Sequence, residues 1–242
     1  MNFKDKVVVI TGGANGIGRT MTEEFTAAGA KAAVIDLEEK GVPSDFFYQG
    51  DIAKEIVLNC FVSKVIEKYG KIDYLINNAC LSRKGILSDC SYEDFNYVLR
   101  VGVTAPYLLT KLFLNYFNEN GAVVNISSSR AFMSQADTES YTAAKGAITA
   151  LTHALAVSLA GKVRVNSIAP GWIDTANGSW SEADEKQHPV KRIGEPSDIV
   201  KTAMFLCSED SGFINGENIT VDGGMTRLMI YHNDNGWKYE GF

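Results

Sequence analysis

The sequence predicts one α/β domain over residues 1–242, built as a doubly wound parallel sheet (a Rossmann fold) with helices on both faces. Short, almost continuous apolar runs are typical of strands that are buried on both faces. These runs alternate with longer stretches of helical periodicity, which favours a parallel sheet, and right-handed crossovers then place helices on both sides. No low-complexity linker, charge block or repeat divides the chain.

Each expected element follows from a local pattern. The apolar run Lys6–Ile10 predicts the first strand, and the helical pattern of Gly18–Ala28 ends at Gly29, a natural helix terminator. The longest helix, Phe95–Phe117, is expected to kink at Pro106. Further strands are expected at Lys31–Ile35, Ile72–Ile76, Ala122–Ile126, Val163–Ile168 and Ile219–Val221, and further helices at Ala53–Tyr69, Tyr141–Leu159 and Pro196–Leu206.

Two segments break this alternation. Residues 175–190 begin with a polar stretch rich in small residues and are expected to form a mobile substrate loop, and residues 225–242 form an irregular C-terminal extension. The aromatic residues of the extension suit a cover for a neighbouring subunit or for the active-site mouth, and they suit a frayed terminus equally well.

Composition and charge exclude several classes of function. Lys and Arg total 23 against 29 Asp and Glu, a net charge of −6, which lacks the basic footprint of a protein that binds nucleic acid or anionic membranes. No apolar run approaches the length of a membrane span, and the N-terminal run is too short for a signal peptide, so a cytoplasmic location is expected. The four cysteines and three histidines lack metal-ligand spacing, so no metal site is expected.

A glycine-rich turn joins the first expected strand to the first helix. Between Thr11 and Gly18 the chain reads TGGANGIG, and its glycines at 12, 16 and 18 allow a tight turn and a close approach of the backbone to a pyrophosphate. The following helix offers unpaired N–H groups and the positive end of its dipole. The spacing Gly-x-x-x-Gly-x-Gly differs from the common dinucleotide fingerprint, so a plain structural turn is the alternative.

An acidic residue, Asp36, follows the second expected strand, 36 − 18 = 18 residues after Gly18. An acid at this place accepts hydrogen bonds from the ribose hydroxyls of NAD and repels the 2′-phosphate of NADP. No Arg or Lys lies between Gly12 and Gly18, and Leu37 follows the acid. NAD is therefore the expected cofactor, with an Asp that caps the loop after a strand as the alternative.

Tyr141 and Lys145 lie four residues apart on one face of an expected helix. An ammonium group near the phenol favours the phenolate and lowers the pKa of Tyr141, which makes it usable as a general base or acid. Ser128, 141 − 128 = 13 residues earlier at a strand end, is placed to hold the substrate oxygen. Tyr107 and Lys111 have the same spacing without such a serine, so they are interpreted as a helix-surface pair.

These motifs resemble, in order, those of the short-chain dehydrogenase/reductase family over nearly the whole chain. The resemblance implies a nicotinamide-dependent oxidoreductase with Ser128, Tyr141 and Lys145 as catalytic residues, and it implies that Lys145 also binds the nicotinamide ribose. The cofactor-binding positions that the resemblance implies are Gly12, Asn15, Gly16, Ile17, Gly18, Asp36, Asp51, Ile52, Asn78, Ala79, Tyr141, Lys145, Pro170, Gly171, Ile173 and Thr175.

Two positions depart from the family pattern. Cys80 replaces the glycine that ends the Asn-Asn-Ala-Gly motif, and it is interpreted as a small buried hydrophobe. Gly102 stands at the place of the family's fourth catalytic residue, an Asn whose backbone carbonyl helps to hold a water next to the lysine. A glycine keeps this carbonyl and tolerates a distorted backbone, but it loses the side-chain amide. A working but weakened proton relay is therefore expected.

The sequence thus predicts an NAD(H)-dependent oxidoreductase that transfers a hydride between nicotinamide and a secondary alcohol or ketone. An NAD(H)-binding sensor without turnover, supported by Gly102, is one alternative. A scaffold that uses neither cofactor nor tyrosine is another, and the intact motifs argue against it. The expected partners are a small alcohol or carbonyl substrate and, by resemblance, further copies of the chain in a dimer or tetramer. The residues expected to line the substrate site are Arg130, Phe132, Gln135 and Trp172.

Overall fold

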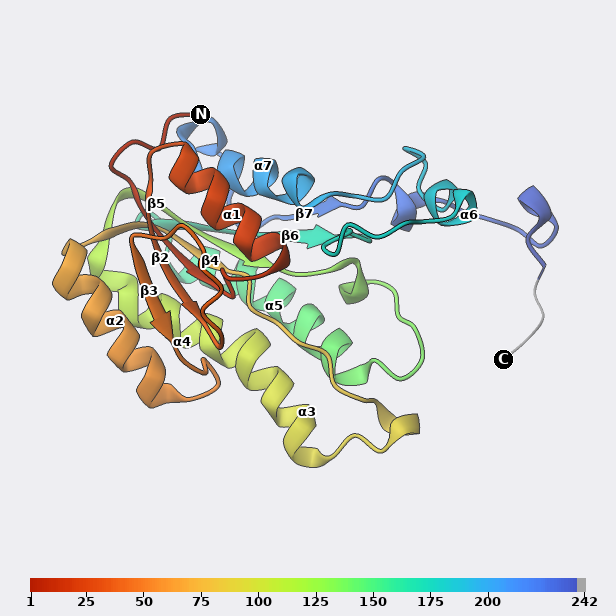
Figure 1. The fold of residues 1–242 in the computed structure, drawn as a ribbon, viewed down its shortest axis with the longest axis horizontal. Coiled ribbons are helices and arrows are strands. Elements are labelled where there is room, and N and C mark those ends of the chain that lie inside the picture. The colour runs from red at the N-terminus through yellow and green to blue at the C-terminus, as the bar shows by residue number, and fades with distance from the viewer. Residues whose placement is uncertain (239–242) are drawn as a thin grey trace.

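The computed structural model describes residues 1–238 and shows a parallel sheet of seven strands between two layers of helices (Figure 1). The strand order is β3-β2-β1-β4-β5-β6-β7, so the chain runs outwards from β1 in one direction and from β4 in the other. This confirms the predicted doubly wound fold. The strands are β1 (Val7–Thr11), β2 (Lys31–Asp36), β3 (Phe46–Gln49), β4 (Ile72–Asn77), β5 (Phe117–Ile126), β6 (Val163–Pro170) and β7 (Asn218–Val221).

Alternate residues of the central strand β1 enter two separate apolar cores. Val7 and Val9 pack in the core covered by α2, α4 and α5, whereas Val8 and Ile10 pack in the core covered by α1 and α7. Because side chains of a strand alternate between its faces, an unbroken apolar run is needed to fill both cores. The helices are α1 (Gly16–Ala27), α2 (Glu55–Tyr69), α3 (Tyr92–Leu99), α4 (Ala105–Phe113), α5 (Glu139–Ser158), α6 (Glu182–Lys186) and α7 (Pro196–Cys207).

The expected long helix is interrupted one turn before Pro106 rather than at it. A π-helical turn over Arg100–Thr104 separates α3 from α4, and the Ala105 N–H donates to the carbonyl five residues back. Pro106 has no N–H for the carbonyl of Gly102, so the regular bonding pattern already fails at this turn. The predicted kink at the proline is therefore corrected to a π turn that contains Gly102.

The helical run from Tyr92 to Tyr116 is 25 residues long, and an 18-residue window within it has a mean hydropathy of 1.2, so by length and composition alone it could cross a membrane. The expectation that no run approaches this length is therefore wrong. The run places Leu109 and Phe113 in the core against the sheet, where both are fully buried. Packing against the sheet requires apolar residues on this face, and 39% of the apolar window is buried in the structure.

Two elements of the structure, β3 and α6, were not predicted from the sequence. β3 is a four-residue edge strand whose side chains are at most half-buried, so it lacks the continuous apolar character of the inner strands. α6 lies inside the predicted irregular loop 175–190, where the Ser181 hydroxyl accepts a bond from the Asp184 N–H and the Asp184 carboxylate accepts one from the Ser181 N–H. This reciprocal cap explains how so polar a segment begins a helix.

The remaining differences concern element ends. β5 begins at Phe117, five residues before its predicted start, whereas the other strands and the helices outside the interrupted run lie within two residues of their expected bounds. Of the predicted C-terminal extension, residues 225–238 contain two short 3-10 turns, and residues 239–242 lie outside the described part of the chain.

Candidate active site

The glycine turn after β1 approaches the end of β4 more closely than a side chain would allow. Gly12 and Gly16 have positive φ angles of 65° and 50°, which L side chains rarely adopt. A Cβ atom at Gly12 would lie 2.8 Å from the Cα of Ala79, and one at Gly18 would overlap the Gly12 carbonyl oxygen. The turn is therefore a bare backbone surface, as close approach to a phosphate requires.

Side chains of β1 and β4 fasten this turn in place. The Asn78 amide donates to the carbonyls of Thr11 (3.2 Å) and Gly12 (3.0 Å). The Thr11 hydroxyl accepts bonds from the N–H groups of Asn78 and Ala79, both at 3.1 Å. Asn15, which precedes α1, has an extended backbone and makes no capping bond with its side chain. The first N–H groups of α1 are thus left to a ligand or water.

A cleft of about 500 Å³ opens over this turn at the carboxyl ends of the strands. The structure brings ten of the implied cofactor residues to its wall, while Gly18 lies beneath the turn. These ten residues are Gly12, Asn15, Gly16, Ile17, Asp36, Asp51, Ile52, Asn78, Ala79 and Thr175. Wall residues that the sequence did not indicate are Ile35, Leu37, Gly50, Leu81, Arg83, Tyr97 and Val101, together with Cys80.

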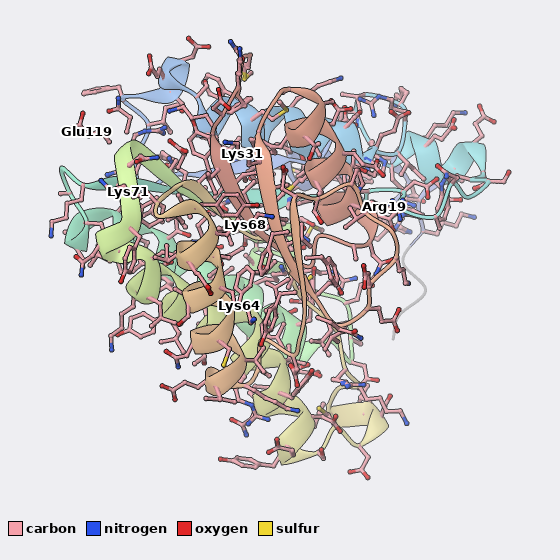
Figure 2. All side chains as sticks on the ribbon, turned by 60° about the vertical axis from the view of Figure 1, so that its left-hand side comes forward. Arg19, Lys31, Lys64, Lys68, Lys71 and Glu119 are labelled. Atoms are coloured by element: carbon pink, nitrogen blue, oxygen red, sulfur yellow. The ribbon has the colours of Figure 1, made fainter. Side chains whose placement is uncertain are left out.

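Asp36 has structural bonds and still faces the cleft. One carboxylate oxygen accepts a bond from the Ala14 N–H (2.9 Å) and the other from the Leu37 N–H (2.7 Å). The oxygen that accepts the Leu37 N–H also accepts the Glu38 N–H at 3.5 Å. The loop-capping alternative is therefore present in the structure, and it does not exclude ligand binding because the oxygen bonded to Ala14 has a second lone pair. Arg19 projects from the first turns of α1 (Figure 2). It is paired with Glu23 at 2.9 Å and is not among the residues that line this cleft.

Ser128, Tyr141 and Lys145 meet between β5 and α5. The Ser128 hydroxyl lies close enough to the Tyr141 phenol to lower its pKa. Lys145 is 3% exposed, and its Nζ donates to the carbonyl of Ile126 at 2.6 Å and lies 5.4 Å from the centre of the Tyr141 ring. The predicted pair thus shares one face of α5, with the serine at the end of the neighbouring strand.

Burial changes the expected acidity of this phenol. Removal from water is the largest influence on the pKa of Tyr141 and raises it, and the net shift is upward although the Lys145 ammonium and Ser128 act to lower it. The expectation that Lys145 lowers the pKa of Tyr141 overall is therefore corrected to a net rise. Lys145 acts in the expected direction, but desolvation is the larger cause.

Cys80 is exposed, so its interpretation as a buried hydrophobe is wrong. It lies at the wall of the cleft over the glycine turn, and its presence raises the pKa of the Tyr141 phenol. The glycine of the family pattern would leave this place empty. The departure from the expected motif therefore puts a thiol beside the Tyr141 phenol.

A second cleft, of about 800 Å³, adjoins the first and has Ser128 and Tyr141 in its wall. It includes the predicted wall residues Arg130, Gln135 and Trp172, but not Phe132. Its other lining residues are Ser82, Ser129, Met133, Ser134, Thr138, Gly171, Ile173, Asp184, Gln187 and Met225. Most of these lining residues carry a hydroxyl, amide or charged group, interspersed with apolar side chains such as Met133 and Met225.

The segment that begins at Pro170 connects the two clefts. Pro170 is buried at the end of β6, and Gly171 and Ile173 line the substrate-side cleft. Thr175 lines the cofactor cleft, where a Cβ at Gly16 would lie 3.3 Å from its methyl group. The loop that follows is held by Trp180, whose ring packs edge-on against Trp172 at 4.8 Å.

Gly102 lies in the π turn and faces α5, one residue from Lys145. A Cβ at this position would be 3.1 Å from the Cβ of Ala144. The glycine therefore lets the π turn pack closely on the helix that carries the tyrosine and the lysine.

A parallel sheet whose strand order reverses above a glycine-rich turn defines a dinucleotide-binding class of fold. A family model described as "Enoyl-(Acyl carrier protein) reductase" matches residues 12–226. The chain belongs to the short-chain dehydrogenase/reductase family and is an oxidoreductase of that family.

Individual relatives cover almost the whole chain. An uncharacterized oxidoreductase of Thermotoga maritima is 38% identical over 95% of this chain and 99% of its own length. The 3-oxoacyl-[acyl-carrier-protein] reductase FabG of the same organism is 31% identical over 93% and 99%. A solved structure of an apo SCOR enzyme from Clostridium thermocellum superposes with a TM-score of 0.91, at 45% identity over 98% and 99% of the two chains.

Proposed function

We propose that this protein is an NAD(H)-dependent oxidoreductase that moves a hydride between nicotinamide and a secondary alcohol or ketone. The observation that carries the proposal is that Ser128 and Tyr141 lie together in the wall of the substrate-side cleft, with Lys145 buried beside the tyrosine ring. A carbonyl or hydroxyl group that enters this cleft meets two hydroxyls that hold an oxygen and exchange a proton with it.

The residues of the first cleft fit a dinucleotide, because a side chain at Gly12 would fill the cradle over which the pyrophosphate would lie. Asp36 would accept the ribose hydroxyls, Asp51 and Ile52 would hold the adenine, and Thr175 the carboxamide. The bound nicotinamide supplies or accepts the hydride.

The protein itself moves the proton. In the reductive direction Tyr141 donates its phenolic proton to the substrate oxygen, and in the oxidative direction it removes the proton from the hydroxyl. Ser128 donates a hydrogen bond to the same oxygen and stabilises the charge that develops there. The buried Lys145 ammonium stabilises the phenolate of Tyr141 against the effect of burial.

Titration of NADH and NADPH by fluorescence tests the cofactor. The Asp36 carboxylate would lie against the 2′-phosphate of NADPH, so we expect NADH to bind at least about tenfold more tightly. Equal affinity for both would refute the assignment of NAD.

Tyr141→Phe tests the chemistry. We expect turnover of an alcohol panel to fall by about a hundredfold or more, because a general acid–base group is lost, while the Kd for NADH stays within about twofold. Substantial residual turnover would defeat the role given to this tyrosine. Ser129→Ala is a matched control, because Ser129 lines the same cleft one residue from Ser128.

Gly102 favours a second candidate, a sensor that binds NAD(H) without turnover. Its missing amide is the one change in the implied proton relay. Tight binding of NADH together with no turnover across the alcohol panel would support the sensor.

A further inference from the structure

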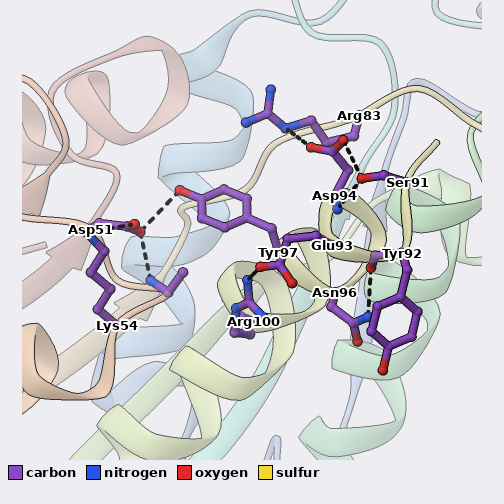
Figure 3. Close-up of polar contacts among 11 residues, drawn as sticks. Asp51, Lys54, Arg83, Ser91, Tyr92, Glu93, Asp94, Asn96, Tyr97 and Arg100 are labelled. Carbon is purple, nitrogen blue, oxygen red and sulfur yellow. Dashed lines mark hydrogen bonds and ion pairs between the residues drawn. The ribbon is translucent and has the colours of Figure 1, made fainter.

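A hydrogen bond crosses the cofactor cleft far from the proton-transfer group. The Tyr97 hydroxyl, from α3, donates to one carboxylate oxygen of Asp51 at 3.1 Å (Figure 3). The same oxygen, Oδ1, accepts the Ala53 N–H at 2.9 Å. The other oxygen, Oδ2, has Lys54 Nζ at 4.0 Å as its one partner among residues 1–238. Oδ1 is therefore saturated, and Oδ2 has free lone pairs for a donor.

Two arginines restrict the Tyr97 ring. The guanidinium carbons of Arg83 and Arg100 lie 5.7 Å and 5.9 Å from the ring centre, above and below it in the view of Figure 3. Arg83 is paired with Asp94 at 3.6 Å, and Arg100 is paired with Glu93, so both cations are anchored to α3. A ring packed in this way keeps its hydroxyl aimed at one point across the cleft.

The place of Asp51 suggests what its free oxygen receives. In a doubly wound sheet a dinucleotide lies across the carboxyl ends of the strands, with its pyrophosphate at the first crossover. On the β3 side of that crossover the cleft wall continues from Asp36 to Asp51, and Ile52 and Val101 supply apolar surface there. A flat purine suits this apolar surface, and adenine presents a 6-amino donor for which a carboxylate is an acceptor.

We propose that Tyr97 is a positioning residue for adenine recognition, which fixes the Asp51 carboxylate so that its Oδ2 accepts the 6-amino group of the cofactor. This inference rests on the proposed function, since it assumes a bound dinucleotide. Tyr97 stays protonated for this task, because burial, and then the neighbouring Asp51 charge, raise its pKa. Without the phenol, the carboxylate keeps only one bond to Oδ1 and turns more freely.

The experiment compares NADH with its deamino analogue, which carries hypoxanthine and so presents a carbonyl oxygen in place of the 6-amino group. Kd values for both are measured by fluorescence, and the result is their ratio, so no turnover is needed. We expect the wild-type protein to bind NADH about tenfold or more tightly than the analogue. The carbonyl oxygen of the analogue and the Asp51 carboxylate are both hydrogen-bond acceptors, so they cannot bond to each other. In Tyr97→Phe we expect this ratio to fall roughly three- to tenfold.

Two further variants test the acceptor itself and provide a matched control. Asp51→Asn presents an amide that donates to the hypoxanthine oxygen, so its ratio falls to about one or inverts. Tyr92→Phe is the matched control, because Tyr92 is on the same helix but 85% exposed, and its ratio equals that of the wild type. Because both ligands are measured on each variant, a general loss of stability lowers both affinities and leaves the ratio unchanged.

The outcomes separate this inference from the proposed function. If the wild-type protein binds neither NADH nor the deamino analogue, the role of Tyr97 and the proposed function are both refuted. If it binds NADH with no preference over the analogue, or if Tyr97→Phe keeps the full wild-type ratio, the role of Tyr97 is refuted and the oxidoreductase proposal stands.

Discussion

Substitution of Gly12 by alanine should destabilise the protein through two separable effects. The backbone at Gly12 is left-handed, with φ of 65°, which costs a residue with a Cβ about 1–2 kcal/mol. The added Cβ would also lie 2.8 Å from the Cα of Ala79, well inside the roughly 3.5 Å at which carbon atoms normally meet. Overpacking of this kind costs about 1–3 kcal/mol. The expected loss in the free energy of unfolding is therefore about 2–5 kcal/mol.

Two other glycines separate the effects. Gly41 has φ of 61° and no atom within 4 Å of an added Cβ, so Gly41→Ala should show the backbone cost alone, about 1–2 kcal/mol. Gly146 lies within α5, also with open space, and Gly146→Ala should stabilise by up to about 1 kcal/mol because alanine is the better helix former.

Urea denaturation of the three variants beside the wild type gives these values. NADH titration should show a loss of affinity of tenfold or more for Gly12→Ala, because the turn moves away from Ala79, and no change for Gly146→Ala. A Gly12→Ala protein no less stable than Gly41→Ala would refute the close packing of the turn on β4.

Three further predictions follow from the site and its surroundings. Cys80→Gly removes one cause of the raised pKa of Tyr141, so the rise of kcat/KM for alcohol oxidation should move to lower pH; an unmoved pH profile would show that the thiol does not act on the phenol. Gly102→Asn should raise turnover if the missing amide weakens the relay, at a cost of about 1 kcal/mol from crowding against α5, and an unchanged rate would show that the amide is immaterial. The bond to Arg192 holds the pKa of Asp198 below its ordinary value of 3.8, so the carboxylate stabilises the fold above that value and loses this effect as the pH falls through its lowered pKa. Thermal melts should therefore show Asp198→Asn about 1 kcal/mol less stable at neutral pH, with the difference vanishing in acid.

The parts of the fold and site that sequence reveals are those fixed by neighbours along the chain. The turn between Thr11 and Gly18 needs particular residue types at fixed spacing, and the pairing of Tyr141 with Lys145 follows from one turn of helix. The inner strands could also be predicted from local sequence, because burial on both faces requires an unbroken apolar run.

Other features depend on contacts between distant residues. The bond from Tyr97 to Asp51 joins positions 46 residues apart, and neither residue stands in a pattern that marks the partner. The net direction of the Tyr141 pKa is set by its degree of burial, which helix spacing does not reveal. Cys80 fits a buried site by residue type, yet the path of the chain after β4 leaves it exposed beside the phenol.

One helical run carries two residues with contacts on opposite sides, Tyr97 with Asp51 and Gly102 with α5. Tyr97 faces Asp51 from α3, and Gly102, five residues on, faces Ala144 beside Lys145. Inserting or deleting a single residue between them would rotate one against the other by roughly 100°, since a turn takes 3.6 residues. The two contacts together therefore constrain the number of residues between Tyr97 and Gly102. Related proteins should tolerate altered side chains between these positions far more readily than altered spacing.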